Sequence, residues 1–409
     1  MSFDVLVLSD LRNPSSPAAE TPRNGNWARL FYRKALRKLQ HENITPGLIV
    51  LFGDLLADAS DADYQLALLA EDVLKDGIPV WAVPGAHDDA GAVERVFNFD
   101  PSARVVEGRD ILQALEGVAL PKFCEAPFAF LHVRLDGAEV TRTVHQLQLP
   151  AGLSDTHSHT AFAQCASGTV AAENQRLAEV LGLDALAITE HAFQLYFAQS
   201  VSWSFKWIDD PAHAEAAWRT PGRGRMRAYQ NFIRNARRGN TLIGLECDLY
   251  DNGKLLLHPE DAAGWDLFLG AMHRIQGAAR GQPPGRIEAL FMRDLRALLS
   301  HPIDILAHPL RIFGANNVPD PVHLFDDIAR LLAEARVAAE INFHNSPPHP
   351  AFFTACLRRG VLLSLGTDTH TPAYSADLHP HVRFLAELGV TEADLPRVLL
   401  DPRKLPRRT

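Results

Sequence analysis

The chain has 409 residues, of which 47% are hydrophobic and 22% charged, a globular composition that excludes a fibrous or largely disordered protein. This length predicts two or three domains at roughly 150 residues each. No apolar run reaches the roughly 18 residues of a membrane span, which excludes an integral membrane protein. The four cysteines form no CxxC pair, which indicates a reducing compartment, here expected to be the cytoplasm, and argues against a disulfide scaffold.

Charge and histidine are unevenly distributed along the chain. Residues 1–150 contain 14 Lys and Arg against 21 Asp and Glu, whereas residues 151–409 contain 26 against 28. Because an acidic chain neutralises phosphates poorly, nucleic acid is not favoured as a partner. Of the 18 histidines, 14 follow residue 150. Histidine is the commonest metal ligand and acid–base residue, so the chemistry is expected in the second region.

The first 150 residues predict a parallel sheet covered by helices and followed by a hairpin. Apolar segments at 3–9, 47–54 and 78–85 alternate with helix-like segments at 27–40 and 61–76. After residue 127 the apolar pattern changes to a period of two, with Asp-Gly at the turn. The short segment at 149–153 is the predicted boundary, so the domains are expected at 1–150 and 151–409.

Residues 151–409 predict an α/β barrel. Seven short apolar segments each end near an ionisable residue: Asp155, Glu190, Glu246, His273, His308, Glu340 and Asp368. Helix-like stretches separate most of them, at 170–181, 287–300, 321–336 and 376–388. Seven strand–helix units imply a closed parallel barrel one unit short of the usual eight. Active sites of such barrels lie at the C-terminal ends of the strands.

The predicted strand ends carry potential metal ligands. His157 and His159 are two residues apart on an extended segment, so both point to one side and can bind one ion. The later strand ends supply His191, Glu246, His273, His308, Glu340, Asn342, Asp368 and His370. A single strand-end histidine is more often a hydrogen-bonded core residue. Seven consecutive strand ends of this kind are not explained by packing, because a buried ionisable group costs several kcal/mol unless it is paired or binds metal.

These motifs resemble, in the same order, those of the polymerase-and-histidinol-phosphatase (PHP) superfamily. They are DTHSH at 155–159, TEH at 189–191, GLE at 244–246, a lone His273, HP at 308–309 and DTH at 368–370. The resemblance covers about residues 153–400. It implies a distorted seven-stranded barrel with two or three divalent ions (Zn, Mn or Fe). It also implies hydrolysis of a phosphoester, with a phosphomonoester favoured, by a metal-bound hydroxide.

The resemblance also implies a set of ligands. One ion would be held by His157, His159, Glu246 and Asp368, a second by Glu246, His273 and His308, and a third by His191 and His370. In the family a further histidine often follows the second histidine of DxHxH by six residues, and here that position is Cys165. We predict that Cys165 completes the third site; the alternatives are a small buried apolar residue at this position, and Gln164 as the ligand. Glu190 replaces the family's aspartate, and its role as a ligand stays open.

Three further features bear on the substrate. Arg311 can hold phosphate oxygens and is predicted to be catalytic with His308 and Asp368, although a surface cation explains it equally well. The stretch 219–238 has seven arginines and no acid, which suits either an oligonucleotide or multiply phosphorylated substrate, or a solvated helix face. The last feature is an aromatic group that forms either a pocket wall or lid, or the packing of an insertion: Tyr196, Phe197, Trp203, Phe205 and Trp207.

The N-terminal region resembles the calcineurin-like metallophosphoesterases, but with an incomplete ligand set. Arg12 replaces the histidine of the first DxH motif, and FGDLLAD keeps Asp54. PGAHDD keeps His87 but has Ala86 in place of the metal-binding asparagine. The final GHxH motif is missing, because the two histidines that remain, His132 and His145, have no second histidine two residues on. A site without about half its ligands should not hold two ions, so a truncated, non-catalytic domain is expected.

The predicted function is therefore that of a metal-dependent phosphoesterase acting on a small phosphorylated substrate. One alternative is a regulatory or scaffold protein in which both domains are relics. The other is a nuclease that acts on oligonucleotides, which only the arginine-rich stretch suggests.

Overall fold

The computed structural model describes residues 2–13, 27–57, 61–98, 100–106, 108–279 and 281–406. The chain divides into two compact units, residues 1–149 and 150–409. None of the described helices is both long and apolar enough to cross a membrane.

The first unit begins with three parallel strands separated by helices. They are β1 (Ser2–Ser9), β2 (Leu48–Phe52) and β3 (Val80–Val83), and helices α1 (Ala28–His41) and α2 (Ala62–Val73) connect them. Each strand is predominantly apolar and largely buried, as expected for a sheet covered on both faces.

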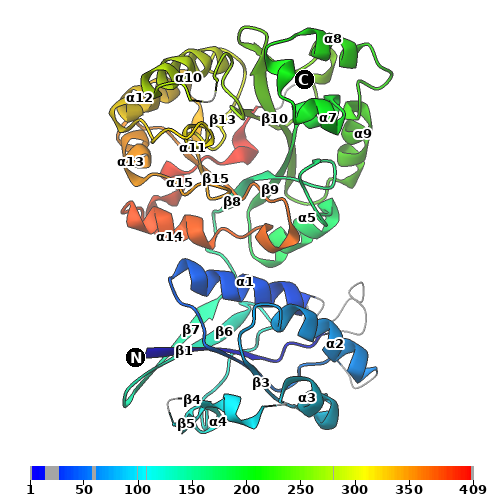
Figure 1. Cartoon of the computed structure of the whole chain (residues 1–409), viewed down its shortest axis with the longest axis vertical. Helices are drawn as coiled ribbons and strands as arrows, with labels where there is room; N and C mark the ends of the chain where they lie inside the picture. The colour runs from blue at the N-terminus through cyan, green and yellow to red at the C-terminus, as the bar shows by residue number, and fades with distance from the viewer. Residues whose placement is uncertain are drawn as a thin grey trace. The chain divides into compact units, whose positions relative to one another are not determined.

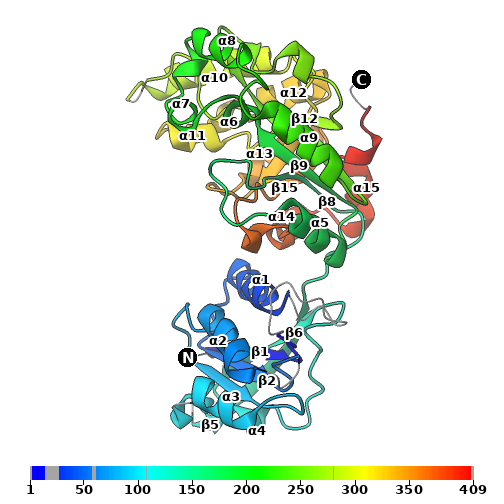
Figure 2. The same cartoon turned by 90° about the vertical axis from the view of Figure 1, so that its right-hand side faces the viewer.

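A hairpin completes this sheet. Strands β6 (Ala129–Asp136) and β7 (Glu139–Gln146) pair antiparallel, and β6 also pairs antiparallel with β1, which gives the order β3-β2-β1-β6-β7. The hairpin therefore extends the parallel strands into one mixed sheet. Helices α1 and α2 lie on one face and the segment containing α4 (Ile111–Ala114) on the other (Figures 1 and 2), where Ile111 and Leu115 join the apolar core. The remaining elements are α3 (Ala90–Phe97), β4 (Val105–Val106) and β5 (Arg109–Asp110).

The second unit is a closed barrel of seven parallel strands. In barrel order they are β8 (Ser154–Ser158), β9 (Ala185–His191), β10 (Thr241–Tyr250), β12 (Leu267–Ala271), β13 (Ile305–Leu306), β14 (Ala338–Asn342) and β15 (Leu363–Gly366). Pairing of β15 with β8 closes the barrel, and a short strand, β11 (Lys254–Leu255), pairs antiparallel with β10. The parallel seven-stranded barrel predicted from the sequence is confirmed.

Helices surround the barrel strands (Figure 1). They are α5 (Ala171–Val180), α9 (Met226–Ala236), α10 (Pro284–Leu298), α12 (Phe325–Ala335), α13 (Pro350–Arg358), α14 (His379–Glu387) and α15 (Leu395–Val398). The helix expected at 321–336 begins later, at Phe325, because a 3-10 turn at Val322–Leu324 follows Pro321.

Short helices gather where the barrel strands end. The segment between β9 and β10 contains α6 (Ala192–Tyr196), α7 (Gln199–Ser202) and α8 (Ala212–Trp218), and α11 (Arg311–Ala315) follows β13. Figure 2 shows α6, α7 and α11 at the same end of the barrel. The loops at this end therefore surround the residues that the strands deliver there.

Candidate metal centre

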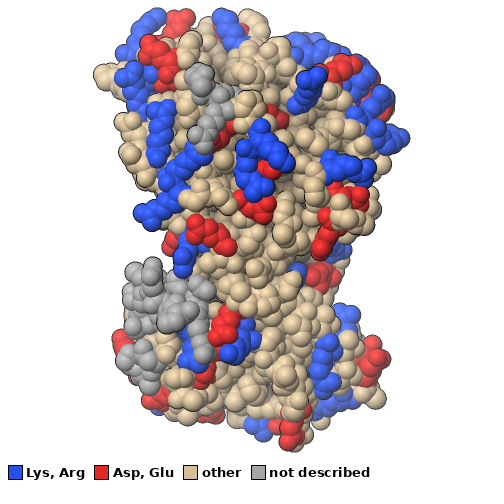
Figure 3. Space-filling view, turned by 180° about the vertical axis from the view of Figure 1, so that it is seen from behind, with Lys and Arg blue, Asp and Glu red and all other residues tan. Residues whose placement is uncertain are grey.

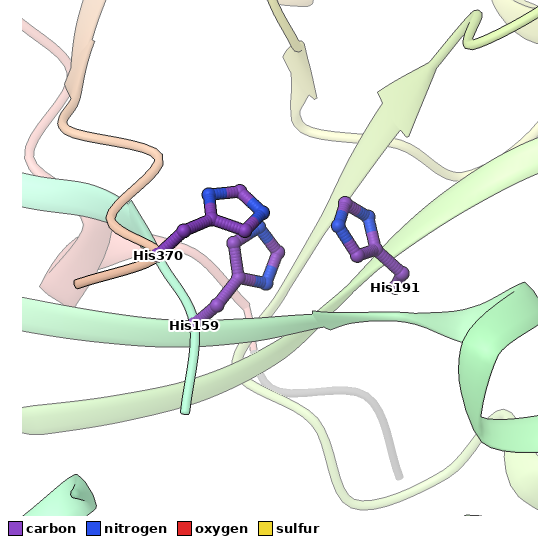
Figure 4. Close-up of side chains that lie close together, drawn as sticks. All are labelled: His159, His191 and His370. Atoms are coloured by element: carbon purple, nitrogen blue, oxygen red, sulfur yellow. The ribbon is translucent and has the colours of Figure 1, made fainter. Parts of the chain in front are cut away.

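The ends of six barrel strands bring eight of the predicted site residues together. This histidine–carboxylate cluster consists of His157, His159, His191, Glu246, His273, His308, Asp368 and His370. His273 and His370 are partly buried, and the other six side chains are buried. Figure 4 shows three of the imidazoles, from His159 directly after β8, His191 at the end of β9 and His370 in the loop after β15, facing one another.

Three sets within the cluster have the spacing of metal ligands. In each set the ligand atoms lie within 4.8 Å of one another: His157, His159 and Asp368; His191, Glu246 and His273; His159, His191 and His370. The carboxylate of Glu246 lies between the imidazoles of His157 and His308. Its Oε2 is 3.4 Å from His157 Nε2, and its Oε1 is 2.8 Å from His308 Nε2. A carboxylate with one oxygen toward each group can bridge two ions.

Two histidines of the cluster are oriented by carboxylates behind them. His157 Nδ1 lies 2.8 Å from Glu340 Oε1, and His273 Nδ1 lies 2.9 Å from Asp248 Oδ1. When Nδ1 donates to a carboxylate, Nε2 is left as a lone-pair donor aimed at the cluster. Pairs of this kind fix the tautomer and ring orientation of metal-binding histidines.

Two other histidines also have an oxygen atom near Nδ1, one of them at a longer distance. His159 Nδ1 is 3.4 Å from Glu190 Oε2, while Glu190 Oε1 accepts hydrogen bonds from the backbone N–H and hydroxyl of Thr160. His370 Nδ1 is 2.7 Å from the backbone carbonyl of Asp368. Glu190, whose role the sequence left open, is thus placed to orient His159.

Glu340 is the residue whose role the sequence did not reveal. Besides His157, it accepts hydrogen bonds from the His308 backbone N–H at 2.6 Å and from Asn342 Nδ2 at 3.1 Å. Gly366 in the neighbouring strand makes room for it, since an added Cβ there would collide with Glu340 Oε1. Asp248 was missed entirely; its signal was its position two residues after Glu246, which places both side chains on one face of β10.

The cluster has the electrostatics of a cation site. Six buried atoms in or beside the cluster make no hydrogen bond of standard geometry within the described part of the chain, although they contact one another or Glu246 as ion pairs: His157 Nε2, His159 Nδ1, Glu190 Oε2, His191 Nδ1, Glu246 Oε2 and His273 Nε2. Buried polar atoms are rarely left unpaired, because each costs about 1–3 kcal/mol. Imidazole nitrogens and carboxylate oxygens together are the donors that zinc, manganese and iron accept, so the residues fit divalent metal ions.

The charged groups of the cluster shift one another's pKa values. Burial alone would raise the pKa of Glu246 and Asp368, but the surrounding histidines hold both pKa values well below the usual range. Burial alone would lower the pKa of His157, but Glu340, Asp368 and Glu246 raise it well above its usual value. The carboxylates are therefore ionised at neutral pH, and their field favours positive charge between them.

Two residues of the cluster have an unusual backbone conformation. His308 and Asp368 have positive φ angles of 30° and 49°. For residues other than glycine such angles cost about 1–3 kcal/mol each and concentrate at functional sites. Both residues follow their strands at the point where the side chain turns into the cluster.

Arg311 belongs to the cluster. Its Nη1 donates to Asp368 Oδ2 at 2.8 Å, and its Nη2 lies 2.6 Å from His308 Nε2. Burial, reinforced by the positive charge of Arg311, lowers the pKa of His308 to about 4, so this imidazole is neutral at physiological pH. Arg311 therefore lies beside the proposed metal ligands, which favours a role in the site over that of a surface cation.

Cys165 lies beside the cluster. Its Sγ is 3.5 Å from His191 Nε2 and accepts a hydrogen bond from Gln194 Nε2 at 3.3 Å. Burial raises the pKa of the thiol to about 12. The alternative ligand, Gln164, donates through Nε2 to the backbone carbonyls of Gln194 and Phe197. Cys165 therefore contacts one of its two expected partners, and its role as a ligand remains a prediction.

The arginine-rich stretch is paired within its own unit. Arg223 is buried and contacts Glu260 at 2.8 Å and Asp261 at 2.6 Å, and Arg237 contacts Asp266 at 2.9 Å. Arg219 and Arg227 also pair with glutamates, while Arg225 and Arg234 donate to backbone carbonyls, so six of the seven arginines have a partner among the described residues. On the face in Figure 3, Lys and Arg are interspersed with Asp, Glu and uncharged residues. The arginines hold the insertion together, which removes the main support for an oligonucleotide substrate.

The aromatic group divides into packed and exposed members. Tyr196, Phe197 and Trp207 are buried, as the packing interpretation expects. Trp203 is 44% exposed and lines a cavity of about 550 Å³ that borders the histidines of the cluster. Both interpretations therefore apply, each to different residues.

In the first unit an arginine lies between two carboxylates. Arg12 Nε is 2.6 Å from Asp10 Oδ1, and its Nη2 is 2.7 Å from Asp54 Oδ2. The backbone N–H of His87 donates to the other oxygen of Asp54, but the His87 side chain is exposed. The guanidinium neutralises two acids that a metal ion would otherwise share.

A family model agrees with the motifs of the second unit. Residues 155–344 match the family model described as PHP domain. A solved structure described as a histidinol phosphatase, hisK, from Listeria monocytogenes is 11% identical, with a TM-score of 0.37. That similarity covers 55% of this chain and 97% of the other. No curated protein matches the chain. The family match does not extend to residues 1–150, whose resemblance to the calcineurin-like enzymes remains a proposal.

Proposed function

We propose that the second unit, in which residues 155–344 match the PHP domain model, is a metal-dependent phosphoesterase that hydrolyses a small phosphomonoester. The observation that carries this proposal is the histidine–carboxylate cluster, in which buried nitrogen and oxygen atoms without hydrogen bonds converge at the strand ends. A scaffold protein would have no need for such a set, because buried unpaired donors destabilise the fold.

The cluster can hold two or three divalent ions. The proposed ligands are those assigned by the resemblance, with Glu246 between the first two ions and Cys165 beside the third. When bound, such ions polarise phosphoryl oxygens and lower the pKa of water enough for it to lose a proton at neutral pH. Glu340, Asp248 and Glu190 lie behind His157, His273 and His159, respectively, and keep these proposed ligands in position.

Arg311 is the residue proposed to bind the phosphate. Its two terminal nitrogens contact Asp368 and His308, each has a second N–H that can donate, and the guanidinium lines the cavity. Two parallel N–H donors match two phosphate oxygens. Arg311 would orient the phosphorus for in-line attack by water, while the ester P–O bond breaks and the alcohol leaves with a proton.

We propose that none of the described residues lining this cavity acts as a nucleophile. Among its described lining residues, Cys165 is the one thiol, and we assign it to metal binding beside His191 rather than to nucleophilic attack. A covalent intermediate on the protein is therefore not expected.

The test is hydrolysis by the metal-loaded full chain. His308→Ala and Asp368→Ala should each lower turnover about 100-fold or more, since several kcal/mol of transition-state stabilisation would be lost. His323→Ala, at an exposed histidine of the same unit, serves as the matched control and should retain activity. A panel of phosphomonoesters, phosphodiesters and single-stranded oligonucleotides should show preference for the first. If the His308/Asp368 double variant hydrolyses the substrate as fast as the parent, the assignment of the catalytic site is wrong.

A further inference from the structure

The cavity beside the cluster has a floor of ligands and a wall of aromatic rings. His191, His273, His370 and Arg311 border it where the strands end. Phe193 and Trp203, from the segment after β9, line it as well. At about 550 Å³ it has the size of a small-molecule site. A phosphate held at the floor would therefore place its ester group beside these rings.

The wall is rigidly connected to the ligands. The Phe193 ring centroid lies 5.2 Å from that of His191 and 5.4 Å from that of His273. On its other side Phe193 stacks on the buried Trp207 at 5.2 Å. The buried stack therefore fixes the position of Phe193 relative to His191 and His273.

Trp203 presents its ring to the cavity. It packs edge-to-face against Phe193, with ring centroids 6.5 Å apart, and against Phe205 at 6.4 Å. It is nevertheless 44% exposed, whereas Phe193 is 1% exposed. Tryptophan is highly buried on average, so an exposed indole at a cavity wall is a surface available for stacking.

The charges of the cavity limit what the substrate can carry. Among its described lining residues Arg311 is the one Lys or Arg, and neither Asp nor Glu lines it. A second phosphate would find no second arginine. A protonated amine would enter a site with no exposed carboxylate and with Arg311 nearby, and an unpaired buried charge is strongly disfavoured.

We propose that the substrate is the monophosphate ester of an uncharged alcohol that carries a planar ring, and that this ring stacks on Trp203 beside Phe193. The proposal rests on the proposed phosphomonoesterase function. It adds a specificity-determining residue and excludes cationic, multiply phosphorylated and polymeric substrates.

The experiment compares matched esters on the metal-loaded full chain. Benzyl phosphate and cyclohexylmethyl phosphate share a primary alcohol leaving group and differ in the ring, and 4-(aminomethyl)benzyl phosphate adds a positive charge. We expect kcat/KM for benzyl phosphate to exceed that for each of the other two by about three- to tenfold. Trp203→Ala should remove the preference for the planar ring, Trp203→Phe should keep most of it, and Phe232→Ala, at an exposed aromatic outside the cavity, should leave it unchanged.

Binding separates this inference from the proposed function. Calorimetry with benzylphosphonate and cyclohexylmethylphosphonate, which are not hydrolysed, should show tighter binding of the first, and Trp203→Ala should abolish the difference. This result would support the ring site even if no ester were hydrolysed. A failure to hydrolyse any ester would contradict the proposed function and not the ring site. Equal affinity of the two phosphonates for the parent, or an unchanged difference in Trp203→Ala, would overturn the inference.

Discussion

His157 Nδ1 lies 2.8 Å from Glu340 Oε1, and both side chains are fully buried. The second oxygen of Glu340 accepts the backbone N–H of His308 at 2.6 Å. One carboxylate therefore sets the tautomer of a histidine in β8 and holds the backbone of another after β13. This arrangement makes Glu340 a positioning residue for the proposed metal centre.

Glu340→Gln tests this role, because it keeps the size of the side chain and removes its charge. We expect metal affinity to fall about 10- to 100-fold, as for other carboxylates behind metal-binding histidines. Titration calorimetry with zinc or manganese measures the change, with thermal unfolding to verify the fold. Asp294→Asn, at a buried carboxylate elsewhere in the unit, is the matched control. Unchanged affinity in Glu340→Gln would show that Glu340 only packs.

Cys165→Ser tests the third metal position. If the sulfur is a ligand, the variant should lose about one equivalent of metal and keep the ions held by the other residues, since serine is a weaker donor. A thiolate ligand also favours zinc over manganese at this position. In the parent, metal should slow alkylation of Cys165 by iodoacetamide, measured by mass spectrometry. Unchanged metal content and zinc affinity in the variant would leave Cys165 as a core residue.

The first unit is predicted not to catalyse. Arg12 pairs with Asp10 and Asp54, so the acids that could hold an ion are already neutralised. Asp54→Ala and His87→Ala should each leave turnover within about twofold of the parent, because neither residue belongs to the barrel. Steady-state kinetics of the full-length variants provides the measurement. A large loss of turnover in a folded Asp54→Ala protein would contradict this assignment.

The barrel could be predicted from the sequence because each apolar strand ends at an ionisable residue. Apolar segments that stop at His, Asp or Glu locate the strands, and the spacing of His157 and His159 locates the site. The same local signals could not reveal Glu340 as the partner of His157, since the two residues are 183 positions apart and only barrel closure brings them together. Pairing across a barrel depends on strand order, which local patterns do not encode.

Long-range pairing also explains the arginine-rich stretch. Residues 219–238 contain no acid, so the sequence suggested a free basic surface. Glu260, Asp261 and Asp266, from the segment between β11 and β12, supply the missing partners. Arg223 is buried by these contacts, which no local charge count predicts.

The proposed function requires the histidine–carboxylate cluster to bind metal in the native protein. Metal analysis by inductively coupled plasma mass spectrometry, on the full chain purified without chelator, tests it directly. We predict two to three equivalents of zinc, manganese or iron per chain, with one or more equivalents lost in the His308/Asp368 double alanine variant. A parent protein that contains less than about 0.2 equivalents, and takes up none on dialysis against these metals, would contradict the account.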